Sequence, residues 1–365
     1  PRGRLVKIAG YRLAMLRAPL REVFTTALRR VEQVEDVVLL LESGCGKIGY
    51  GSAPATEAIT GANHASIINS LKHVLLPQVV GRDCDNLATL AADLSSENSN
   101  ARSALEMALF DLAAQDQGIP LCRFLGGEPA TLRTSLTLSV NSPRAMAASA
   151  RLALARGFTG LKVKIGGDPA EDLARVRAVV DAVDGGASLY LDANQAWTVD
   201  QAVEVMGLLE TAGIVVELLE QPLQADDQAG LAQLRQQLAT PIMADESVFS
   251  VGDATALIAL GAADILNIKL VKSGGITGAL AIADVAAAAG MPCMMGCMLE
   301  SAVGVAAAAH LAAARPATIT RVDLDAPLLA THNPVRGGTA FIGSQVNVNQ
   351  APGLGIDGIS GLEYL

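Results

Sequence analysis

The sequence predicts an α/β fold: a (β/α) barrel of the TIM type with seven or eight βα units, preceded by an α+β capping domain that the C-terminal tail completes. The barrel is indicated by short apolar strand segments that alternate with Ala-rich helical segments. The capping domain is indicated by an antiparallel pattern ahead of them. The length of 365 residues also exceeds the size at which one hydrophobic core usually stops growing, so a second, smaller domain is expected.

The capping domain is expected to span residues 1–125. Its first part, residues 4–52, alternates apolar and polar side chains in three runs, with "GCGKIG" as the turn between the second and third runs. This pattern is typical of an antiparallel meander. Helical periodicity then predicts helices at 62–82, 86–97 and 100–117, the last ending at Gly118.

The barrel domain is expected to span residues 126–327. Eight apolar segments predict its strands, at about 134–140, 161–165, 188–192, 214–220, 241–245, 263–269, 291–296 and 318–323. Charge and the content of Pro and Gly rise after Pro327, so residues 328–365 are expected to leave the barrel and return to the capping domain.

Composition excludes several classes of partner. The formal net charge is −10 and the pI about 4.9, whereas binding to nucleic acid or to an anionic membrane needs basic patches. The mean hydropathy of +0.37 reflects Ala-rich stretches such as 285–299, which Gly and Pro interrupt, so no membrane-spanning helix is expected. We therefore expect a small-molecule substrate, no nucleic-acid partner and no membrane association.

The cysteines indicate a reducing compartment. There are five, widely spread and without a CxxC pair: Cys45, Cys84, Cys122, Cys293 and Cys297. No secretory signal precedes them, so reduced thiols and a cytoplasmic location are expected. Cys293 and Cys297 could form half of a zinc site, but no second Cys or His pair at zinc spacing accompanies them.

Three carboxylates stand at the ends of consecutive predicted barrel strands. Asp192, Glu220 and Asp245 are separated by 28 and 25 residues, close to one βα repeat each time. Successive parallel strands therefore bring them to the same C-terminal rim, where barrel enzymes carry out their chemistry. Hard oxygen ligands on rigid strands suit Mg²⁺, whereas zinc would prefer nitrogen or sulfur. The sequence thus predicts one Mg²⁺ bound by these three side chains.

Three lysines accompany the carboxylates. Lys162 and Lys164 lie two residues apart in "LKVKIGG" and so share one strand face, and an unpaired ammonium group in a protein interior is costly. Lys269 ends the strand after the carboxylate strands, so Lys164 and Lys269 are expected to face each other across the metal. A single acid or lysine at a strand end is more often a solvated rim residue, but this set at one-repeat spacing favours a functional site.

This arrangement suits removal of a proton from a carbon next to a carboxylate, through an enolate that the metal stabilises. Lys164 is expected to be the first base and Lys269 the second, on the opposite face, which would invert the stereocentre. Neighbouring cations and the metal are expected to lower the pKa of the catalytic lysine. Lys162 is expected to stay charged, to help lower the pKa of Lys164 and to stabilise the substrate carboxylate.

These residues occur in motifs that resemble the enolase superfamily, in particular its muconate lactonizing enzyme subgroup. The motifs are "KVK" at 162–164, "LDANQAW" at 191–197, "EQP" at 220–222, "ADES" at 244–247 and "NIKLVKSGG" at 267–275, with "SALEMALFDLAAQ" and "FLGG" ahead of the barrel. The resemblance implies Mg²⁺ with lysine bases, and a cap whose loops close over the barrel mouth and select the substrate. It leaves the reaction open, since epimerases, cycloisomerases and a synthase share this site.

The eighth strand narrows the choice. In "RVDLDAP", Asp323 and Asp325 lie two residues apart and are expected to share one strand face beside the metal. Two such acids would repel a dicarboxylate such as muconate but would hold an ammonium group. The pair resembles the signature of the dipeptide epimerases, in which it binds the N-terminal amine of an L-Ala-L-Glu type substrate. A surface turn next to Pro327 is the alternative.

The resemblance implies further substrate contacts. Thr137 and the segment Gly296, Cys297 and Met298 are expected to be wall residues, and Arg29 to bind the side-chain carboxylate of the second residue of the dipeptide. Arg29 could instead be an exposed cation on a mobile cap loop. Ser52 is a departure, since it stands at a position that is commonly acidic in the family, which affects hydrogen bonding inside the cap.

The histidines are a useful negative observation. His64, His73, His310 and His332 match none of the positions of the Asp–His base of the mandelate racemase branch, and His310 is expected to be a satisfied core histidine.

We therefore expect a Mg²⁺-dependent epimerase of L,L-dipeptides of the Ala-Glu type, acting at the C-terminal residue and assembled as a homo-oligomer, as is common in the family. Muconate cycloisomerisation and o-succinylbenzoate synthesis are alternative reactions on the same scaffold. A non-catalytic barrel that binds a peptide or an amino acid is an alternative of another class.

Overall fold

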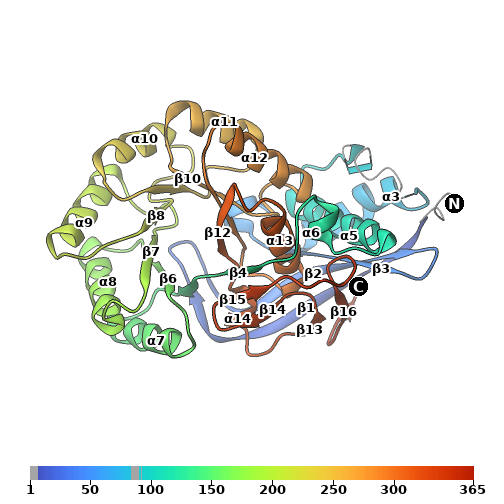
Figure 1. Cartoon of the computed structure of the whole chain (residues 1–365), viewed down its shortest axis with the longest axis horizontal. Helices are drawn as coiled ribbons and strands as arrows, with labels where there is room; N and C mark the ends of the chain where they lie inside the picture. Colours follow the sequence, from blue (N-terminus) through green and yellow to red (C-terminus); the bar gives the residue numbers. More distant parts are fainter. Residues whose placement is uncertain (1–6, 84–89, 92) are drawn as a thin grey trace.

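The structure, a computed structural model, describes residues 7–83, 90–91 and 93–365. Cys84 and part of the helix expected at 86–97 lie outside these residues. The described part consists of a barrel and a cap that lie side by side (Figure 1).

Eight parallel strands form the barrel sheet, in the order β12-β11-β10-β9-β8-β7-β6-β5 (Figure 1). They are β5 (Leu136–Leu138), β6 (Gly160–Lys164), β7 (Ser188–Asp192), β8 (Leu218–Glu220), β9 (Ile242–Ala244), β10 (Ile265–Ile268), β11 (Cys293–Gly296) and β12 (Ile319–Asp323). All the predicted barrel strands are confirmed, although β5, β8 and β9 have only three residues each. Spatial order follows sequence order because each strand is joined to the next by a crossover connection.

The crossover helices cover the outside of this sheet. They are α7 (Pro143–Ala155), α8 (Pro169–Val183), α9 (Val199–Thr211), α10 (Gln228–Gln237), α11 (Val251–Leu260), α12 (Ile276–Ala288) and α13 (Ala302–Ala314). Asp168, Thr198 and Ser250 each accept a backbone N–H of the first helical turn. These caps fix where each loop becomes a helix, and so keep the loops above the strand ends short.

The barrel closes between β12 and β5 through side chains rather than a regular ladder. A single bridge joins Thr134 to Val322, and Leu324 donates its backbone N–H to Thr134 Oγ1 over 2.8 Å. Ser135 Oγ donates to Asp323 Oδ1 over 2.7 Å, and the Thr137 N–H donates to Asp325 Oδ2 over 2.6 Å. Two acids of the eighth strand region therefore hold the seam of the barrel.

The cap begins with the predicted meander. Strands β1 (Ile8–Thr25), β2 (Arg30–Ser43) and β3 (Ile48–Pro54) pair antiparallel, and the turn expected at "GCGKIG" joins β2 to β3. The cap helices are α1 (Glu57–Thr60), α2 (His64–Ser70), the π-helix η1 (Leu71–Leu75), α3 (Leu76–Val79), α5 (Ser99–Gln117) and α6 (Leu121–Phe124).

The helix expected at 62–82 is therefore divided into three parts. Pro77 stands in the first turn of α3, and proline lacks an N–H and clashes with the carbonyl group four residues before it. The π-helical turn at Leu71–Leu75 contains the carbonyl group with which the proline ring would clash. The hydrophobic periodicity of the sequence is uniform across this segment and therefore does not reveal the break.

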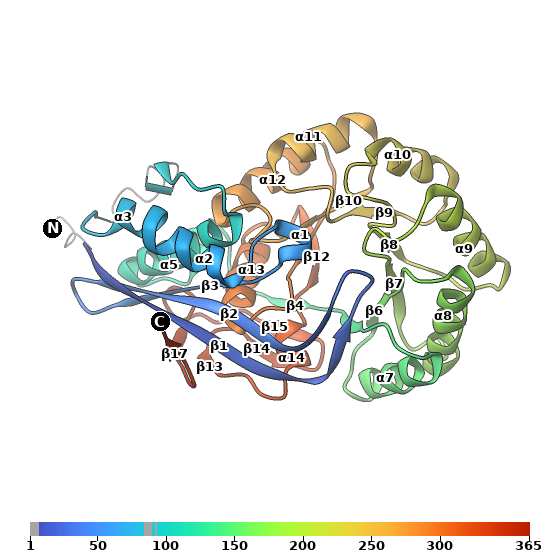
Figure 2. The same ribbon diagram turned by 180° about the vertical axis from the view of Figure 1, so that it is seen from behind.

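The C-terminal segment runs back along the cap (Figure 2). After α14 (Ala326–Leu329) it forms β13 (Val335–Gly337), β14 (Ala340–Ile342), β15 (Gln345–Asn347), β16 (Ile356–Ile359) and β17 (Glu363–Tyr364). Strand β15 pairs with β4 (Thr131–Arg133), and β17 pairs with β1 at the edge of the cap sheet. The domain boundaries at 125/126 and 327/328 stay a prediction.

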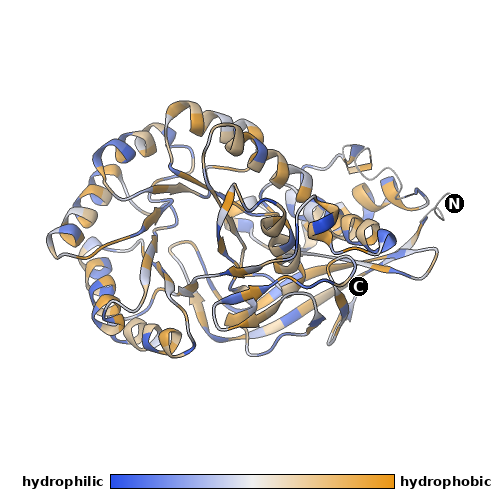
Figure 3. Ribbon diagram, in the orientation of Figure 1, coloured by the Kyte–Doolittle hydropathy of each residue, from blue (hydrophilic) through white to orange (hydrophobic). Residues whose placement is uncertain are grey.

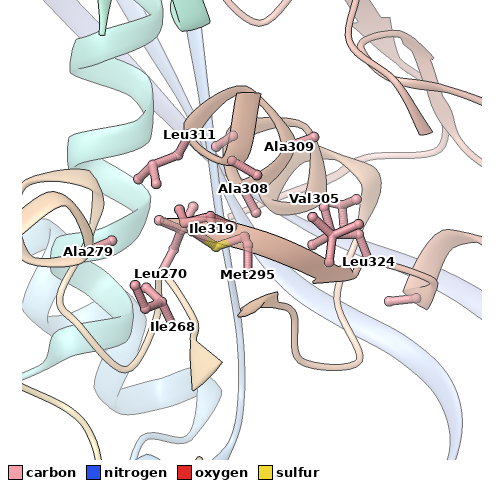
Figure 4. Close-up of a cluster of buried hydrophobic side chains, with 14 of the residues drawn as sticks. Ile268, Leu270, Ala279, Met295, Val305, Ala308, Ala309, Leu311, Ile319 and Leu324 are labelled. Carbon is pink, nitrogen blue, oxygen red and sulfur yellow. The ribbon is translucent and has the colours of Figure 1, made fainter. Parts of the chain in front are cut away.

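A continuous core joins cap and barrel through α13, in which every residue is buried. Figure 4 shows Val305, Ala308 and Leu311 of this helix facing Met295 and Ile319 of the barrel strands. Alanine-rich packing explains the high mean hydropathy, while the outer barrel helices carry hydrophilic stretches (Figure 3). Among the described residues, no helix combines the length and the apolar character that crossing a membrane requires.

His310 lies inside this buried helix, as predicted for a core histidine, but it is only half satisfied. Its Nδ1 accepts the Cys122 N–H over 3.1 Å, whereas Nε2 has no hydrogen-bond partner among the described residues. Burial lowers the pKa of His310 to about 4, so the ring is neutral near pH 7.

The neutral buried ring predicts a pH-dependent stability. Between the unfolded pKa of about 6.5 and the folded value of about 4, the unfolded chain takes up a proton that the folded protein excludes. The free energy of unfolding should therefore decrease as the pH is lowered from about 6.5 to about 4. This decrease should be up to about 3 kcal/mol larger in the wild type than in His310→Asn. Urea unfolding followed by circular dichroism measures both. His73→Asn, at an exposed histidine, should keep the wild-type dependence, and parallel curves for His310→Asn would contradict the assignment.

Candidate active site

The C-terminal ends of the barrel strands surround a pocket. The cap contributes Phe24 of β1, Thr26, Leu28 and Arg29 of the β1–β2 turn, and Ile59 of α1. The barrel contributes Thr137, Lys162, Lys164, Asn194, Lys269, Cys297, Met298, Leu299, Asp323 and Asp325, and α14 adds Ala326 and Leu329. The pocket therefore exists only where cap and barrel meet.

The three predicted carboxylates lie side by side at the strand ends; they do not line the pocket themselves, but each contacts a lysine that does. Asp192 ends β7 and pairs in register with Glu220, which ends β8. Glu220 pairs with Met243 of β9, and Asp245 follows two residues later, so it returns to the same face. All three are at most 1% exposed. The one-repeat spacing in the sequence thus became adjacency in space.

Lys162 lies in the middle of the acids. Its Nζ is 2.7 Å from Glu220 Oε2, 2.9 Å from Asp323 Oδ2 and 3.1 Å from Asp192 Oδ2. Burial by itself would lower the pKa of Lys162, but the surrounding carboxylates, Asp323 first, hold it well above its usual value. Lys162 is therefore expected to stay charged, and its role toward Lys164 and the substrate stays a prediction.

Lys164 and Lys269 stand on opposite sides of the barrel. Strands β6 and β10 are four places apart in a sheet of eight, which in a nearly closed barrel is the largest separation two strands can have. Lys164 contacts Asp192 and lies 3.2 Å from Asn194 Oδ1, while Lys269 Nζ lies 2.6 Å from Asp245 Oδ2. Both ammonium groups border the pocket, as the two-sided arrangement requires.

Among the protein groups alone, the balance of charge at Lys269 favours its charged form. The pKa of Lys269 is raised rather than lowered, because the facing Asp245 carboxylate outweighs both burial and the repulsion from Lys162. The sequence places the lysines at the same rim of the barrel as the acids, but it does not show which acid each lysine would contact. A cation bound by the carboxylates would compensate the negative charge that now raises this pKa.

The carboxylates fit a divalent cation by their chemistry. Burial and the neighbouring Asp192 and Asp245 raise the pKa of Glu220 to about 8, which shows that the third negative charge lacks compensation. Glu220 Oε2 makes no hydrogen bond of good geometry, although Lys162 Nζ lies 2.7 Å away. As they stand, no three His, Cys, Asp or Glu side chains of the described residues form a group that could hold a metal ion. Lysine ammonium groups take the carboxylate oxygens instead.

Several supporting residues were not anticipated from the sequence. Lys272 is buried with its Nζ 2.5 Å from Asp245 Oδ1, so that Asp245 is held by two lysines. Asn267 donates to Glu220 Oε1 over 2.9 Å, and Gln221 accepts the Asp245 N–H over 2.8 Å. Asn194 donates to Glu246 Oε1 over 3.1 Å. All of these residues lie within or directly beside the motifs of the acids, which was the only signal available.

Asp323 and Asp325 are both 4% exposed and border the pocket, so the alternative of a surface turn is excluded. Their expected shared strand face is wrong in detail, because β12 ends at Asp323 and Asp325 precedes α14 with helical backbone angles. Asp323 is bound by Ser135 and Lys162, and Asp325 by the Thr137 N–H. Burial and the charge of Asp323 raise the pKa of Asp325 to about 6.

The remaining predicted contacts divide into two groups. Thr137, Cys297, Met298 and Arg29 border the pocket, whereas Gly296 does not. Gly296 ends β11 beneath the wall, where a Cβ atom would lie 2.5 Å from Asn267 Oδ1 and 3.0 Å from Lys269 Cε. Its role is therefore to leave room for Lys269 rather than to contact a ligand.

Arg29 is a half-buried cation facing the pocket. Burial lowers the pKa of Arg29, and among the described residues its guanidinium group makes no hydrogen bond or ion pair. The alternative of a fully exposed cation is therefore excluded.

Ser52 lies in a buried cluster between cap and barrel. Its Oγ is 3.2 Å from Ser301 Oγ, and Asp36 on the neighbouring strand β2 accepts the Ser301 N–H over 2.9 Å. A carboxylate is thus present in this part of the cap, but it comes from β2 instead of position 52.

Fold and rim together define a barrel protein with paired acids and amines at its mouth. The sequence matches the family described as "Enolase C-terminal domain-like" over residues 145–358, and the "Mandelate racemase / muconate lactonizing enzyme, N-terminal domain" over residues 11–126. The chain belongs to the mandelate racemase/muconate lactonizing enzyme family of the enolase superfamily.

Relatives within this family are similar over their whole length. The L-Ala-D/L-Glu epimerase of Bacillus subtilis is 42% identical over 97% of this chain and 97% of its own. A substrate-liganded structure of the L-Ala-D/L-Glu epimerase from Bacillus subtilis superposes with a TM-score of 0.94, covering 97% and 99% of the two chains. A dipeptide epimerase from Enterococcus faecalis, complexed with Mg and L-Leu-L-Tyr, has a TM-score of 0.91 at 36% identity, covering 97% of this chain and 99% of its own.

The double lysine clamp on Asp245 predicts a large stability effect. Lys272→Met removes one of two cations from a buried carboxylate, and breaking a buried pair typically costs about 3–5 kcal/mol. Lys47→Met is the matched control, because Lys47 pairs with Asp116 where both side chains are about one-third exposed. It should cost less than about 1 kcal/mol. Urea unfolding in the presence of a chelator measures both variants, and equal losses would contradict the clamp.

Proposed function

We propose that this chain is a Mg²⁺-dependent dipeptide epimerase that inverts the α-carbon of the C-terminal residue. The observation that carries the proposal is the position of Lys164 and Lys269 on opposite sides of a pocket, each in contact with one of three buried carboxylates at adjacent strand ends. The similar proteins from Bacillus subtilis and Enterococcus faecalis, named as epimerases of dipeptides, support it.

Asp192, Glu220 and Asp245 would hold the Mg²⁺, since they are buried, adjacent and rich in hard oxygen ligands. When bound, Mg²⁺ supplies positive charge that stabilises the enolate formed when the α-proton leaves. Lys162, which stays charged among the acids, adds to this stabilisation on the side of β6.

The two remaining lysines carry the proton. One starts each turnover as a neutral amine and removes the α-proton, and the other starts protonated and delivers a proton to the opposite face of the same carbon. The product has the inverted configuration, and the protonation states of Lys164 and Lys269 are exchanged. The reverse reaction runs through the same groups, so neither epimer is a dead end.

Asp323 and Asp325 favour a substrate with an ammonium group. Both are buried at the pocket, and burial together with their mutual repulsion raises the pKa of Asp325, so a cation beside them is stabilised and an additional carboxylate is not. This charge pattern disfavours muconate as substrate and supports a dipeptide whose N-terminal amine lies at these acids. Cycloisomerisation and o-succinylbenzoate synthesis stay alternatives on the same scaffold.

Arg29 supports the Ala-Glu type of substrate. A half-buried guanidinium group that borders the pocket without a partner among the described residues would bind the side-chain carboxylate of an acidic second residue. The walls that Thr137, Cys297 and Met298 form would then enclose the rest of the dipeptide.

We also propose a cytoplasmic location and a homo-oligomeric state. The location is supported by Cys45, Cys122, Cys293 and Cys297, which are free thiols among the described residues. The oligomer is supported by the family resemblance.

A two-base mechanism predicts a stereochemical pattern in Lys164→Ala and Lys269→Ala. Each variant should lose epimerisation of L-Ala-L-Glu by about 10³-fold or more, because one proton transfer is missing. Each should still exchange the α-proton of one epimer in D₂O, and the two variants should retain exchange with opposite epimers. Mass spectrometry and chiral chromatography measure this.

Lys47→Ala, at a surface lysine of the cap, is the control and should keep full turnover. If both variants retained α-proton exchange with the same epimer, the two lysines would lie on one side of the α-carbon. If Lys164→Ala turned over L-Ala-L-Glu as fast as the wild type, Lys164 would not be a catalytic base. If the wild type bound dipeptides without exchanging their α-proton, the chain would be a binding protein.

Arg29→Ala should change specificity rather than chemistry. The KM for L-Ala-L-Glu should rise about tenfold more than the KM for L-Ala-L-Leu, because only the former has a side-chain carboxylate to lose its partner. Arg30→Ala is the matched control, since Arg30 is exposed and pairs with Glu32 at 3.7 Å. An equal rise for both dipeptides would contradict the assignment of Arg29.

A further inference from the structure

The substrate wall after β11 is held from two sides. Met298 and Leu299 border the pocket, and the segment continues through Glu300 to Ser301, the N-cap residue of α13. Glu300 Oε1 accepts the Met298 N–H over 2.8 Å. Asp36 Oδ2, on strand β2 of the cap, accepts the Ser301 N–H over 2.9 Å. The wall thus has one anchor of its own and one that belongs to the cap.

The anchor from the cap is fully enclosed. Asp36 is 0% exposed and Glu300 5% exposed, and Asp36 Oδ1 has no hydrogen-bond partner among the described residues. Burial raises the pKa of Asp36 to about 6 and that of Glu300 to about 8, the latter also through Asp36. Two acids in contact with one short segment are costly to bury, so their presence calls for a role other than simple stabilisation.

The packing around the two acids leaves the segment little freedom. A Cβ atom at Gly304 would collide with Glu300 Oε2 and lie 3.4 Å from Ser52 Oγ, so the first turn of α13 is shaped around the Glu300 carboxyl group. Ser301 Oγ lies 3.2 Å from Ser52 Oγ on strand β3. Strands of the cap, the start of α13 and the pocket wall therefore meet at one point.

We infer that Asp36 is a positioning residue through which the cap fixes the Met298–Leu299 wall and so tunes the fit of the substrate. Asp36 touches neither lysine nor any of the three carboxylates in the contacts of the described residues, so it acts on the wall and leaves proton transfer alone. The inference rests on the proposed dipeptide epimerase activity. It assigns to a cap residue outside the pocket an influence on which dipeptides fit.

The test compares two changes at this position. Asp36→Ala removes the acceptor of the Ser301 N–H, whereas Asp36→Asn keeps a side-chain oxygen in its place. Asp36→Ala should raise the KM for L-Ala-L-Glu about tenfold while kcat changes less than about threefold, and should change the ratio of kcat/KM between L-Ala-L-Glu and L-Ala-L-Leu. Asp36→Asn should keep the KM of the wild type.

Glu35→Ala is the matched control, because Glu35 is the neighbouring residue on β2 but pairs with Arg17 at the surface. Hydrogen exchange of the peptide containing Ser301 gives a second readout that needs no turnover: Asp36→Ala should accelerate exchange and Asp36→Asn should not. A wild-type KM in Asp36→Ala, with only a lower Tm, would overturn the inference while leaving the proposed function intact. Failure of the wild type to epimerise any dipeptide would overturn both.

Discussion

The structure depends on the balance of charge at the C-terminal rim of the barrel. Lys162 lies among Asp192, Glu220 and Asp323, and Asp245 is held by Lys269 and Lys272, all of them buried. Because each charge compensates its neighbours, removal of one leaves another unpaired where water cannot reach it. The barrel strands must therefore hold these side chains in fixed register, and the short, capped loops above them serve that requirement. The same balance leaves the pKa of Glu220 raised, and a divalent cation at this position would supply the positive charge that the carboxylate lacks.

The acids of the eighth strand region join two structural tasks. Asp323 and Asp325 bind Ser135 and the Thr137 N–H across the seam between β12 and β5, and both border the pocket. A group that binds at these acids is therefore linked to the closure of the barrel itself. On the other side of the pocket, the cap supplies the β1–β2 turn, and Asp36 ties the cap sheet to the wall after β11. Hydrogen bonds that hold the architecture therefore reach directly to the pocket lining.

Much of the fold and the positions of the main site residues could be predicted from the sequence, because strand alternation and repeat spacing decide which side chain ends each strand. Asp192, Glu220 and Lys269 illustrate this, since one βα repeat separates strand ends that meet on one rim. Spacing carries no information on side-chain partners, so the pairing of Asp245 with both Lys269 and Lys272 was not foreseen. Asp325 lies beyond its strand because backbone geometry changes after Asp323, and Gly296 serves the packing of Lys269 instead of the pocket. The division of the cap helix before Pro77 likewise depends on three-dimensional crowding that periodicity does not encode, and so does the lack of a partner for His310 Nε2 among the described residues.

Helix α13 is the barrel helix in which substitutions are most restricted. All thirteen of its residues are buried, between the barrel strands on one side and the cap on the other. An ordinary outer helix, by contrast, has a solvent-facing side on which substitutions are well tolerated. Alanine lets both neighbours approach closely, and any larger side chain would have to displace one of them. Substitutions on the solvent-facing sides of the outer helices should therefore cost little, whereas a larger side chain at an alanine of α13 would require adjustment of both cap and barrel.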